Sequence, residues 1–283
     1  MAAPDPFRPR AITAALAAAL LFGTTGTILV NAPHGADAWS VGCLRLLVGG
    51  LTLLAVARGR LVLSRAMVLG AMGVAVFQLG YFLAVERTGV AIGTVVTIGS
   101  GPVLTGLIHA VRTRTVPHRS WMVGTALSVA GVALLGAVGR AASADAVGIL
   151  LAVAAGLGWA VFSTVAKDHI TRGHDSTATM ATVFCGGSVL LTPFLVWHSP
   201  SWVMSTRGAT VAVVLGVVTV GLAYTLYGWA LRHLPAPTVI TLTLLEPVTA
   251  ALLAAVVVHE GIRPSGWAGV ALVLVGLAVT ARG

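Results

Sequence analysis

The stretch 238–260, TVITLTLLEPVTAALLAAVVVHE, decides the fold, because it is apolar and long enough to cross a bilayer. Near its middle stands one acidic residue, Glu246, followed directly by Pro247. An ionisable side chain at that depth is costly, and such residues commonly mark the path or the binding site of a solute. Proline also removes a backbone donor and frees a carbonyl one turn earlier in the helix. The stretch therefore predicts a membrane helix that is broken beside a functional acid.

The composition of the whole chain is typical of an integral membrane protein. Of its 283 residues, 57% are hydrophobic and only 9% are charged, whereas soluble domains carry roughly 25% charged residues. The net charge of +9 would suggest nucleic-acid binding in a soluble protein. Here the basic residues fall in short gaps between apolar runs, so we expect the lipid bilayer as the partner and no nucleic acid.

Ten apolar runs of the length needed to span a membrane follow one another with short connections. We therefore expect an all-α integral membrane fold of ten transmembrane helices. The first run is expected to remain as a span and not to be removed as a signal peptide, because so many further runs follow it. The ten runs are 11–30, 38–56, 66–85, 90–111, 121–138, 146–166, 177–197, 208–230, 236–258 and 266–281.

The distribution of basic residues predicts which side of the membrane each connection faces. With the N-terminus inside, most Lys and Arg residues fall on the cytoplasmic side, and Arg45 lies within the second run. Both termini are then cytoplasmic (N-in/C-in), and we expect a multi-pass protein of the cell membrane. The basic residues left outside are Arg87, Arg140, Arg207 and Arg263.

The chain also repeats itself. A shift of 145 residues places the end of the first half on the end of the second (247 − 102 = 145). Each half, 1–141 and 142–283, then holds five runs, and since five is odd, the second half enters the membrane in the opposite sense. Inverted repeats with proline or glycine at matching positions are typical of secondary transporters whose site lies between the halves, near the midplane. The matched residues are Pro102 with Pro247, Gly124 with Gly269, Ala126 with Ala271, Leu127 with Leu272, and Gly131 with Gly276.

The run LEPVTAALLAAVVVHE is followed by Gly269 and Gly276, and three further segments stand out: CLRLLVGG around Arg45, GSGPVLTGL around Pro102 and GLGWAVFSTVAK around Trp159. Together, over nearly the whole chain, they resemble the EamA-type transporters of the drug/metabolite transporter superfamily. The resemblance implies two inverted five-helix repeats around a central cavity. It also implies the export of small metabolites such as amino acids.

Glu246 and Arg45 are the ionisable residues deep within the runs. Arg45 lies about 10 Å from the outer end of its run at 1.5 Å per residue, so the two side chains are expected at similar depths. In one interpretation, Glu246 binds an ionised group of the solute or exchanges a proton. In the other, the two residues pair, or Arg45 bonds backbone carbonyls, and they hold the halves together. For Arg45 we favour the structural role.

The first repeat has a counterpart of the acid and the proline, namely Gly101 and Pro102. With Pro247, they are the candidates for helix breaks that gate the site. Thr97 and Ser100 precede the first of these breaks and are expected to line the cavity, where a solute would approach freed carbonyls. The alternative is ordinary helix packing, in which small and hydroxyl residues are also enriched.

Polar and aromatic side chains of other runs are candidates for the wall of the cavity. Aromatic residues near the ends of spans usually belong to the membrane interface, but Trp159 and Tyr224 lie deeper. His109, at the end of the fourth run, is expected to cap its helix or reach the interface more than to shuttle protons. The cavity candidates are Gln78, Tyr81, Trp159, Tyr224 and Thr25.

The sequence thus predicts a secondary active transporter that exports a small polar or zwitterionic metabolite, with an amino acid as the first candidate. Alternating access is expected to come from rocking of one five-helix half against the other. The rival interpretations are a membrane enzyme acting on a lipid-linked substrate and a non-transporting sensor or scaffold.

No GxxxxGK[ST], HExxH or GxSxG motif occurs in the sequence. We therefore expect neither an enzyme nor a bound metal or cofactor, while proton coupling through Glu246 stays open. A homodimer also stays open, because Gly89 and Gly93 form a small-residue motif of the kind that packs membrane helices.

Overall fold

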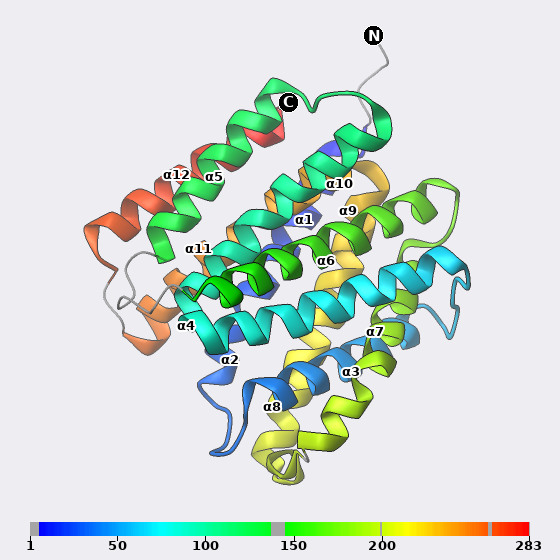
Figure 1. Cartoon of the computed structure of the whole chain (residues 1–283), viewed down its shortest axis with the longest axis vertical. Coiled ribbons are helices and arrows are strands. Elements are labelled where there is room, and N and C mark those ends of the chain that lie inside the picture. Colours follow the sequence, from blue (N-terminus) through cyan, green and yellow to red (C-terminus); the bar gives the residue numbers. More distant parts are fainter. Residues whose placement is uncertain (1–5, 137–144, 199, 260–261, 283) are drawn as a thin grey trace.

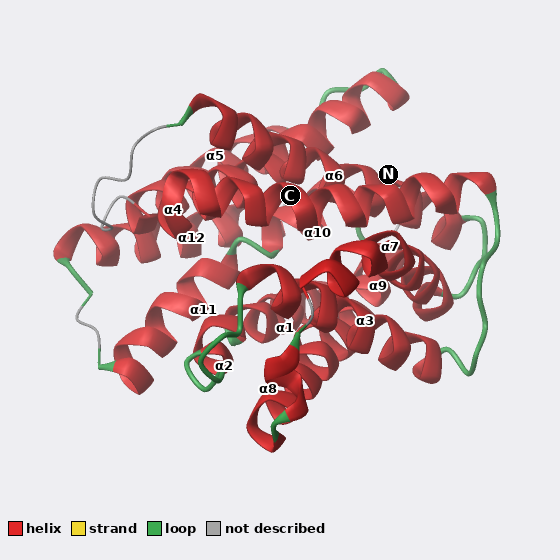
Figure 2. Ribbon diagram, turned by 60° about the horizontal axis from the view of Figure 1, so that its bottom comes forward, coloured by secondary structure: helices red, strands yellow, loops and turns green. Residues whose placement is uncertain are grey.

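The computed structural model describes residues 6–136, 145–198, 200–259 and 262–282. In these ranges the chain forms only helices and the loops that join them, without a strand (Figure 2). Nine helical segments of the described chain are long and apolar enough to cross a membrane, which confirms the prediction of an all-α membrane fold. The predicted boundary between residues 141 and 142 lies outside the described residues. The helices are α1 (Arg8–Gly23), α2 (Thr25–Leu29), α3 (Ala38–Val56), α4 (Arg65–Thr113), α5 (Arg119–Gly136), α6 (Ala146–Thr171), α7 (Ser176–His198), η1 (Ser201–Met204), α8 (Thr206–Gly216), η2 (Val217–Leu222), α9 (Ala223–His233), α10 (Ala236–Leu242), α11 (Leu245–Leu253), η3 (Ala254–Val258) and α12 (Pro264–Arg282).

Helix α4 covers two of the predicted spans in one 49-residue element. At 1.5 Å per residue it would be about 74 Å long if straight, more than twice the ~30 Å of a bilayer's apolar core. The element turns back on itself (Figure 1). The residue inside it with non-helical dihedral angles is Gly89, whose φ of 81° and ψ of 161° suit a residue without a Cβ. The hydroxyls of Tyr81 and Thr94, 3.1 Å apart, join the two arms across this turn. Gly93 packs on Val85 within this turn. Both glycines of the small-residue motif, Gly89 and Gly93, therefore make contacts inside the chain where α4 reverses.

The two prolines matched by the repeat have different surroundings. Helix α4 runs through Pro102 without a break, which corrects the prediction of a helix break at Gly101 and Pro102. The second repeat is broken, but at Thr243 and Leu244, between α10 and α11 and before Pro247. Neighbouring helices, side chains or water can satisfy the carbonyl that an interior proline leaves free. A proline alone therefore does not fix a break in a membrane helix.

The first helix of each repeat packs against the helices of the other repeat. Helix α6, the first of the second repeat, lies along both arms of α4 (Figure 1). Helix α1, the first of the first repeat, packs in the same way on α9, α10 and α11. A Cβ added to Gly158 of α6 would come within 2.5 Å of the Gly73 carbonyl oxygen and 2.7 Å of the Phe77 nitrogen. The backbones of α4 and α6 are thus in direct contact, and the two repeats are interlocked.

Helices α5 and α12, the last of each repeat, pair with each other at the edge of the bundle (Figure 1). Their contact is reciprocal. A Cβ on Gly124 would lie 2.6 Å from the Gly276 carbonyl oxygen, and a Cβ on Gly131 would lie 2.6 Å from the Gly269 carbonyl oxygen. These four glycines are the ones that the 145-residue shift superposes, so the repeat in the sequence builds a pseudo-twofold contact in the structure.

Both ends of the chain lie at the same end of the bundle. The guanidinium of Arg8 donates to the carbonyl oxygen of Ala281 at 3.4 Å. The Phe7 ring packs on His233, at the last residue of α9, with ring centroids 5.1 Å apart. This end of the bundle is termed the terminal end.

Candidate functional site

Glu246 is positioned by the break between α10 and α11. Because Pro247 has no N–H, it cannot donate the usual helical bond to the Thr243 carbonyl. The backbone N–H of Glu246 donates to that oxygen instead, at 2.9 Å. Glu246 thus occupies the first turn of α11, where the aligned peptide dipoles favour a negative charge. Its carbonyl oxygen lies 2.9 Å from the Cβ position of Gly23, so α1 passes directly beside the break.

Polar side chains of three other helices lie near enough to Glu246 to act on it electrostatically. These side chains are Arg45 on α3, Tyr81 on α4 and Tyr224 on α9. Arg45 and Glu246 are both half-buried, and among the described residues no ion pair within 4.0 Å joins either of them to a partner. The Nε atom of Arg45 is buried and has no hydrogen-bond partner among the residues that the structure describes. A direct pair of Arg45 with Glu246 is therefore not the arrangement found.

Aromatic rings stand around this polar group. Tyr224 is 4% exposed and packs 4.9 Å from Phe22 of α1, between ring centroids. On the side of α4 and α6, the Phe77 ring lies 6.5 Å from Tyr81 and 5.8 Å from Trp159. Tyrosine and tryptophan present an apolar face together with one polar edge. The rings can therefore hold the apolar part of a solute beside the charges.

Both repeats contribute buried polar groups that lack hydrogen bonds, Thr97 on α4 and Trp159 on α6. Thr97 Oγ1 and Trp159 Nε1 are buried, and within the described ranges neither has a partner of good geometry, although the Tyr227 hydroxyl lies close to the indole. Gly101 packs on the Trp159 ring, with its Cβ position 2.9 Å from Cε3. Buried polar groups without partners are rare. With the Nε of Arg45, they are three of the six buried side-chain atoms that lack a partner within the described chain, the others being Trp121 Nε1, Ser128 Oγ and Thr280 Oγ1.

Other predicted residues are already bonded to the backbone. Gln78 Nε2 donates to the Gly42 carbonyl at 3.1 Å, and the Thr25 hydroxyl donates to the Phe22 carbonyl at 2.6 Å. The Ser100 hydroxyl donates to the carbonyl one turn earlier at 3.1 Å. The structure thus places Arg45, Tyr81 and Tyr224 within electrostatic range of Glu246. It packs Gly101, one turn after Thr97, on Trp159. Gln78, Thr25 and Ser100 are instead tied to nearby carbonyls.

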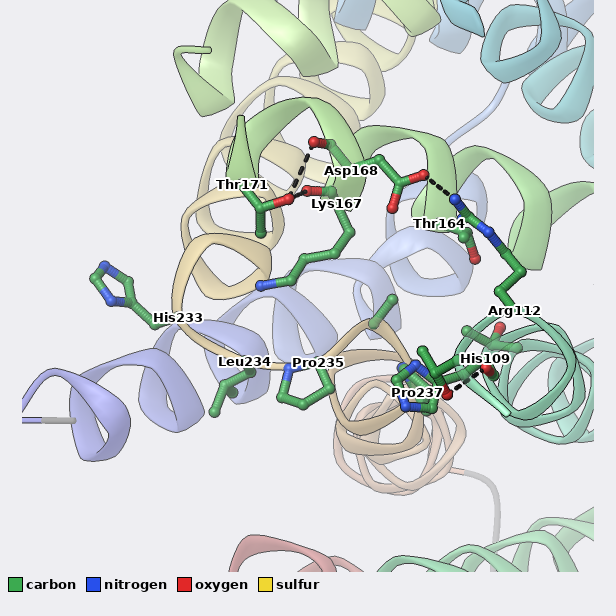
Figure 3. A pocket seen from close by; sticks show the side chains of 13 residues that line it. His109, Arg112, Thr164, Lys167, Asp168, Thr171, His233, Leu234, Pro235 and Pro237 are labelled. Carbon is green, nitrogen blue, oxygen red and sulfur yellow. Dashed lines mark hydrogen bonds and ion pairs between the residues drawn. The ribbon is translucent and has the colours of Figure 1, made fainter. Parts of the chain in front are cut away.

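A cavity of about 510 Å³, termed the terminal cavity, opens at the terminal end between the second arm of α4, the end of α6 and the α9–α10 connection (Figure 3). It begins one turn from the contact of Gly101 with Trp159, because Thr105 lines it and donates to the Gly101 carbonyl at 2.8 Å. Lys167 extends from α6 to the Leu231 carbonyl at the end of α9, with Nζ 2.7 Å from the oxygen. The lining residues are Thr105, His109, Arg112, Thr113, Thr164, Lys167, Asp168, Thr171, His233, Leu234, Pro235, Ala236 and Pro237.

Basic side chains outnumber acidic ones in the terminal cavity. Arg112 and Asp168 pair with each other, whereas the bond of Lys167 goes to a neutral carbonyl. An anionic group is therefore favoured in this cavity. None of the site residues predicted from the sequence lines it. His109, for which a capping or interfacial role is expected, is among the lining residues. The signal that could have indicated it is Lys167, the only lysine of the sequence, at the end of an apolar run.

Two segments of the chain, residues 9–137 and 146–282, match the model of the EamA-like transporter family, one in each half. A relative from Bacillus subtilis (strain 168), the uncharacterized transporter YwfM, is 36% identical over 270 residues, which cover 93% of this chain and 91% of the relative. A solved crystal structure with 20% sequence identity superposes with a TM-score of 0.81 over 96% of both chains, which shows a shared fold. The two matched segments and the curated relative together establish that this multi-pass membrane protein belongs to the EamA-like transporter family.

Proposed function

We propose that the protein is a secondary transporter of the cell membrane that exports a small zwitterionic metabolite, with an amino acid or a close relative as the first candidate. The solute would bind at the centre of the bundle, between Arg45 and Glu246. Membership of the family supports transport as the activity. The class of solute, the direction and the mechanism are inferred from the arrangement of charges.

The observation that carries the proposal is the presence of two ionisable side chains of opposite sign, Arg45 and Glu246, that lie within electrostatic range of each other without forming an ion pair. Arg45 and Glu246 lie in membrane-length helical segments, where a lone charge is costly. A solute with an ammonium group and a carboxylate would neutralise both, the ammonium at Glu246 and the carboxylate at the guanidinium of Arg45, which suits bidentate contacts. Within the described chain the buried Nε of Arg45 has no hydrogen-bond partner, which supports a role in binding the carboxylate of the solute.

We further propose that α4 crosses the membrane twice, which gives ten crossings with both termini in the cytoplasm. The hydrogen bond between the arms of α4 supports two crossings, and the excess of basic residues at the terminal end supports the orientation. The terminal cavity would then open to the cytoplasm. Lys167 would draw solutes that carry a carboxylate from that side, which supports export.

Alternating access needs two rigid bodies that move against each other. Because each repeat packs on the first helix of the other, these bodies do not coincide with the two halves of the sequence. We propose that α6 moves with α4, and α1 with α9 and α11, in place of rocking between the two halves of the sequence. Ion pairs tie α6 to α4 at both ends, Arg87 with Asp145 at 3.1 Å and Arg112 with Asp168. The guanidinium of Arg87 also holds the pKa of the partly exposed Asp145 carboxyl below its usual value.

A disulfide between α4 and α6 is expected to leave transport intact. The double substitution Arg87→Cys and Gly148→Cys, in a chain whose Cys43 and Cys185 are replaced by alanine, places two thiols at this contact. The Cβ position of Gly148 lies 2.9 Å from the Arg87 Cβ, so a small separation reaches the roughly 3.5–4.5 Å that a disulfide needs. Counterflow in liposomes is measured before and after oxidation, with re-reduced protein as the control. Loss of counterflow on oxidation would contradict the proposed bodies.

The proposed function is tested by counterflow of labelled amino acids into liposomes that hold the purified chain and an excess of the unlabelled amino acid. Zwitterionic amino acids are expected to exchange and to compete with one another. Analogues that lack the ammonium or the carboxylate should compete about 30-fold less well, because each leaves one half-buried charge in the membrane unpaired. Exchange of no amino acid, or equal competition by the analogues, would overturn the proposal. A membrane enzyme or a scaffold would give no flux at all.

A further inference from the structure

A second cavity, of about 360 Å³, borders the terminal cavity and is termed the lateral groove. It lies between the first residues of α4, the last residues of α4 and the second half of α6. Leu69, which lines it, is 50% exposed, so the groove opens on the surface of membrane-length helices, where the solvent is lipid. The lining residues are Ala66, Leu69, Ile108, Arg112, Val161, Thr164, Val165, Asp168, His169 and Arg172.

The lining changes from apolar to charged toward the terminal end. On α6, Val161 and Val165 are followed by Asp168 and then Arg172, just beyond the helix end. Near the end of α4, the apolar Ile108 is likewise followed one turn later by Arg112. A phospholipid has the same order, with acyl chains toward the midplane and a charged headgroup at the interface. The groove therefore matches the polarity of one lipid molecule.

The length of the groove fits a single leaflet. Val161 and Arg172 are 11 positions apart, which corresponds to about 16 Å along a helix at 1.5 Å per residue. Half of the apolar core of a bilayer is about 15 Å thick. A lipid chain along Val161 would thus place its headgroup at Arg172.

The charged end of the groove favours an anion. It carries two arginines, Arg112 and Arg172, against one carboxylate, Asp168. His169, which also lines the groove, is hydrogen-bonded within the chain. Its Nδ1 donates to the Val165 carbonyl at 3.1 Å, because a carbonyl can only accept, and its Nε2 bonds the Ser64 hydroxyl at 2.9 Å. Basic pockets between helices at a membrane surface are typical binding sites of anionic headgroups.

We propose that the lateral groove binds one anionic phospholipid, with its phosphate at Arg112 and Arg172 and one acyl chain along Val161 and Leu69. The ion pair of Arg112 with Asp168 borders both the groove and the terminal cavity (Figure 3). A bound phosphate therefore competes with Asp168 for Arg112 and loosens the partition between the two spaces. Lipid composition is thereby coupled to access of the solute, while the lipid site itself does not depend on which solute is carried.

The proposal is tested by native mass spectrometry of the purified full-length chain, titrated with dioleoyl phosphatidylglycerol or dioleoyl phosphatidylcholine. Phosphatidylglycerol is expected to bind the first site at least about fivefold more tightly. Arg172→Gln should weaken its binding about fivefold, the equivalent of ~1 kcal/mol for one arginine near the surface, and leave phosphatidylcholine unchanged. Asp168→Asn should strengthen binding of phosphatidylglycerol, because it releases Arg112 from its competing partner.

The matched control is Arg10→Gln, which removes the same charge from an exposed residue near the N-terminus, at the same end of the bundle. It is expected to leave both affinities unchanged. Leu69→Trp fills the groove and should lower binding of both lipids. Equal binding of the two lipids, equal effects of Arg172→Gln and Arg10→Gln, or weaker binding in Asp168→Asn would each overturn the proposal. Because lipid binding is read directly, failure of the transport proposal would leave these results unaffected.

Discussion

Replacing Glu246 by glutamine is expected to lower Vmax/KM for counterflow of a zwitterionic amino acid about 30-fold. The amide keeps the size of the side chain but loses the charge-assisted bond to the ammonium group of the solute. In a poorly solvated site such a bond is worth about 2 kcal/mol, and every 1.4 kcal/mol is tenfold in affinity. Initial rates in liposomes over a range of labelled amino-acid concentrations measure this effect.

Glu86→Gln is the matched control, because it makes the same chemical change at an exposed residue of α4. It is expected to transport like the unaltered chain. A carboxylic acid without an ammonium group should compete equally well against both proteins, since it makes no contact that Glu246 would lose. If Glu246→Gln and Glu86→Gln behave alike, the ammonium group is not bound at Glu246.

Glu246→Gln also tests whether this carboxylate carries a proton. With proton exchange at Glu246, an imposed pH gradient drives accumulation of solute by the unaltered chain but not by the variant. Accumulation driven by the gradient in the variant would exclude Glu246 as the proton carrier. Fluorescence of a dye trapped in the same liposomes reports the gradient, so flux and coupling are read together.

The substitution Gly158→Ala is expected to lower the apparent Tm by about 5 °C or more. The added Cβ would meet the Gly73 carbonyl oxygen at 2.5 Å and the Phe77 nitrogen at 2.7 Å, well inside the ~3.5 Å at which non-bonded atoms pack. Backbone atoms of a helix cannot turn aside, so α4 and α6 must separate. Overpacking of this kind costs about 1–3 kcal/mol, and 1 kcal/mol shifts Tm by about 2–4 °C in domains of 150–250 residues.

Gly26→Ala is the control for this change. Gly26 also lies in a helix, α2, but a Cβ there would meet nothing within 4 Å. Alanine is the better helix former by about 0.5–1 kcal/mol, so the apparent Tm should stay the same or rise slightly. Both variants are heated in detergent, and the fraction that remains monodisperse is measured by size-exclusion chromatography. An equal loss in the two would show that the contact of α4 with α6 does not limit stability.

Hydropathy was sufficient to locate the helices, because inside a bilayer the backbone has few alternatives to helical hydrogen bonding. The runs 38–56 and 146–166, for example, correspond to Ala38–Val56 and Ala146–Thr171. The reversal of α4, in contrast, could not be predicted from hydropathy. Two runs separated by a few residues predict two helices and a loop, whereas the chain reverses at one non-helical residue, Gly89. Hydropathy does not report a single pair of dihedral angles.

The site could be predicted only in part. Glu246 and Arg45 were visible because a charge within an apolar run is costly whatever surrounds it. That they do not pair, and that Lys167 lines a cavity at the terminal end, depends on how α3, α6 and α11 are placed in space. Pro102 shows the same limit, because matched prolines lie in an unbroken helix in one repeat and just after a break in the other.

The exchange of first helices between the repeats has a consequence for how the chain is made. Helix α6 follows α4 only after the whole of α5, yet it packs along both arms of α4. The nascent first repeat therefore enters the membrane with an open seam, and the glycines that line it, Gly73 and Gly80, have no partner backbone until α6 leaves the ribosome. The packing of helix α1 is delayed further, because its partners α9, α10 and α11 are synthesised later still. Each helix can insert as it emerges, but neither repeat completes its packing before almost the entire protein has been translated.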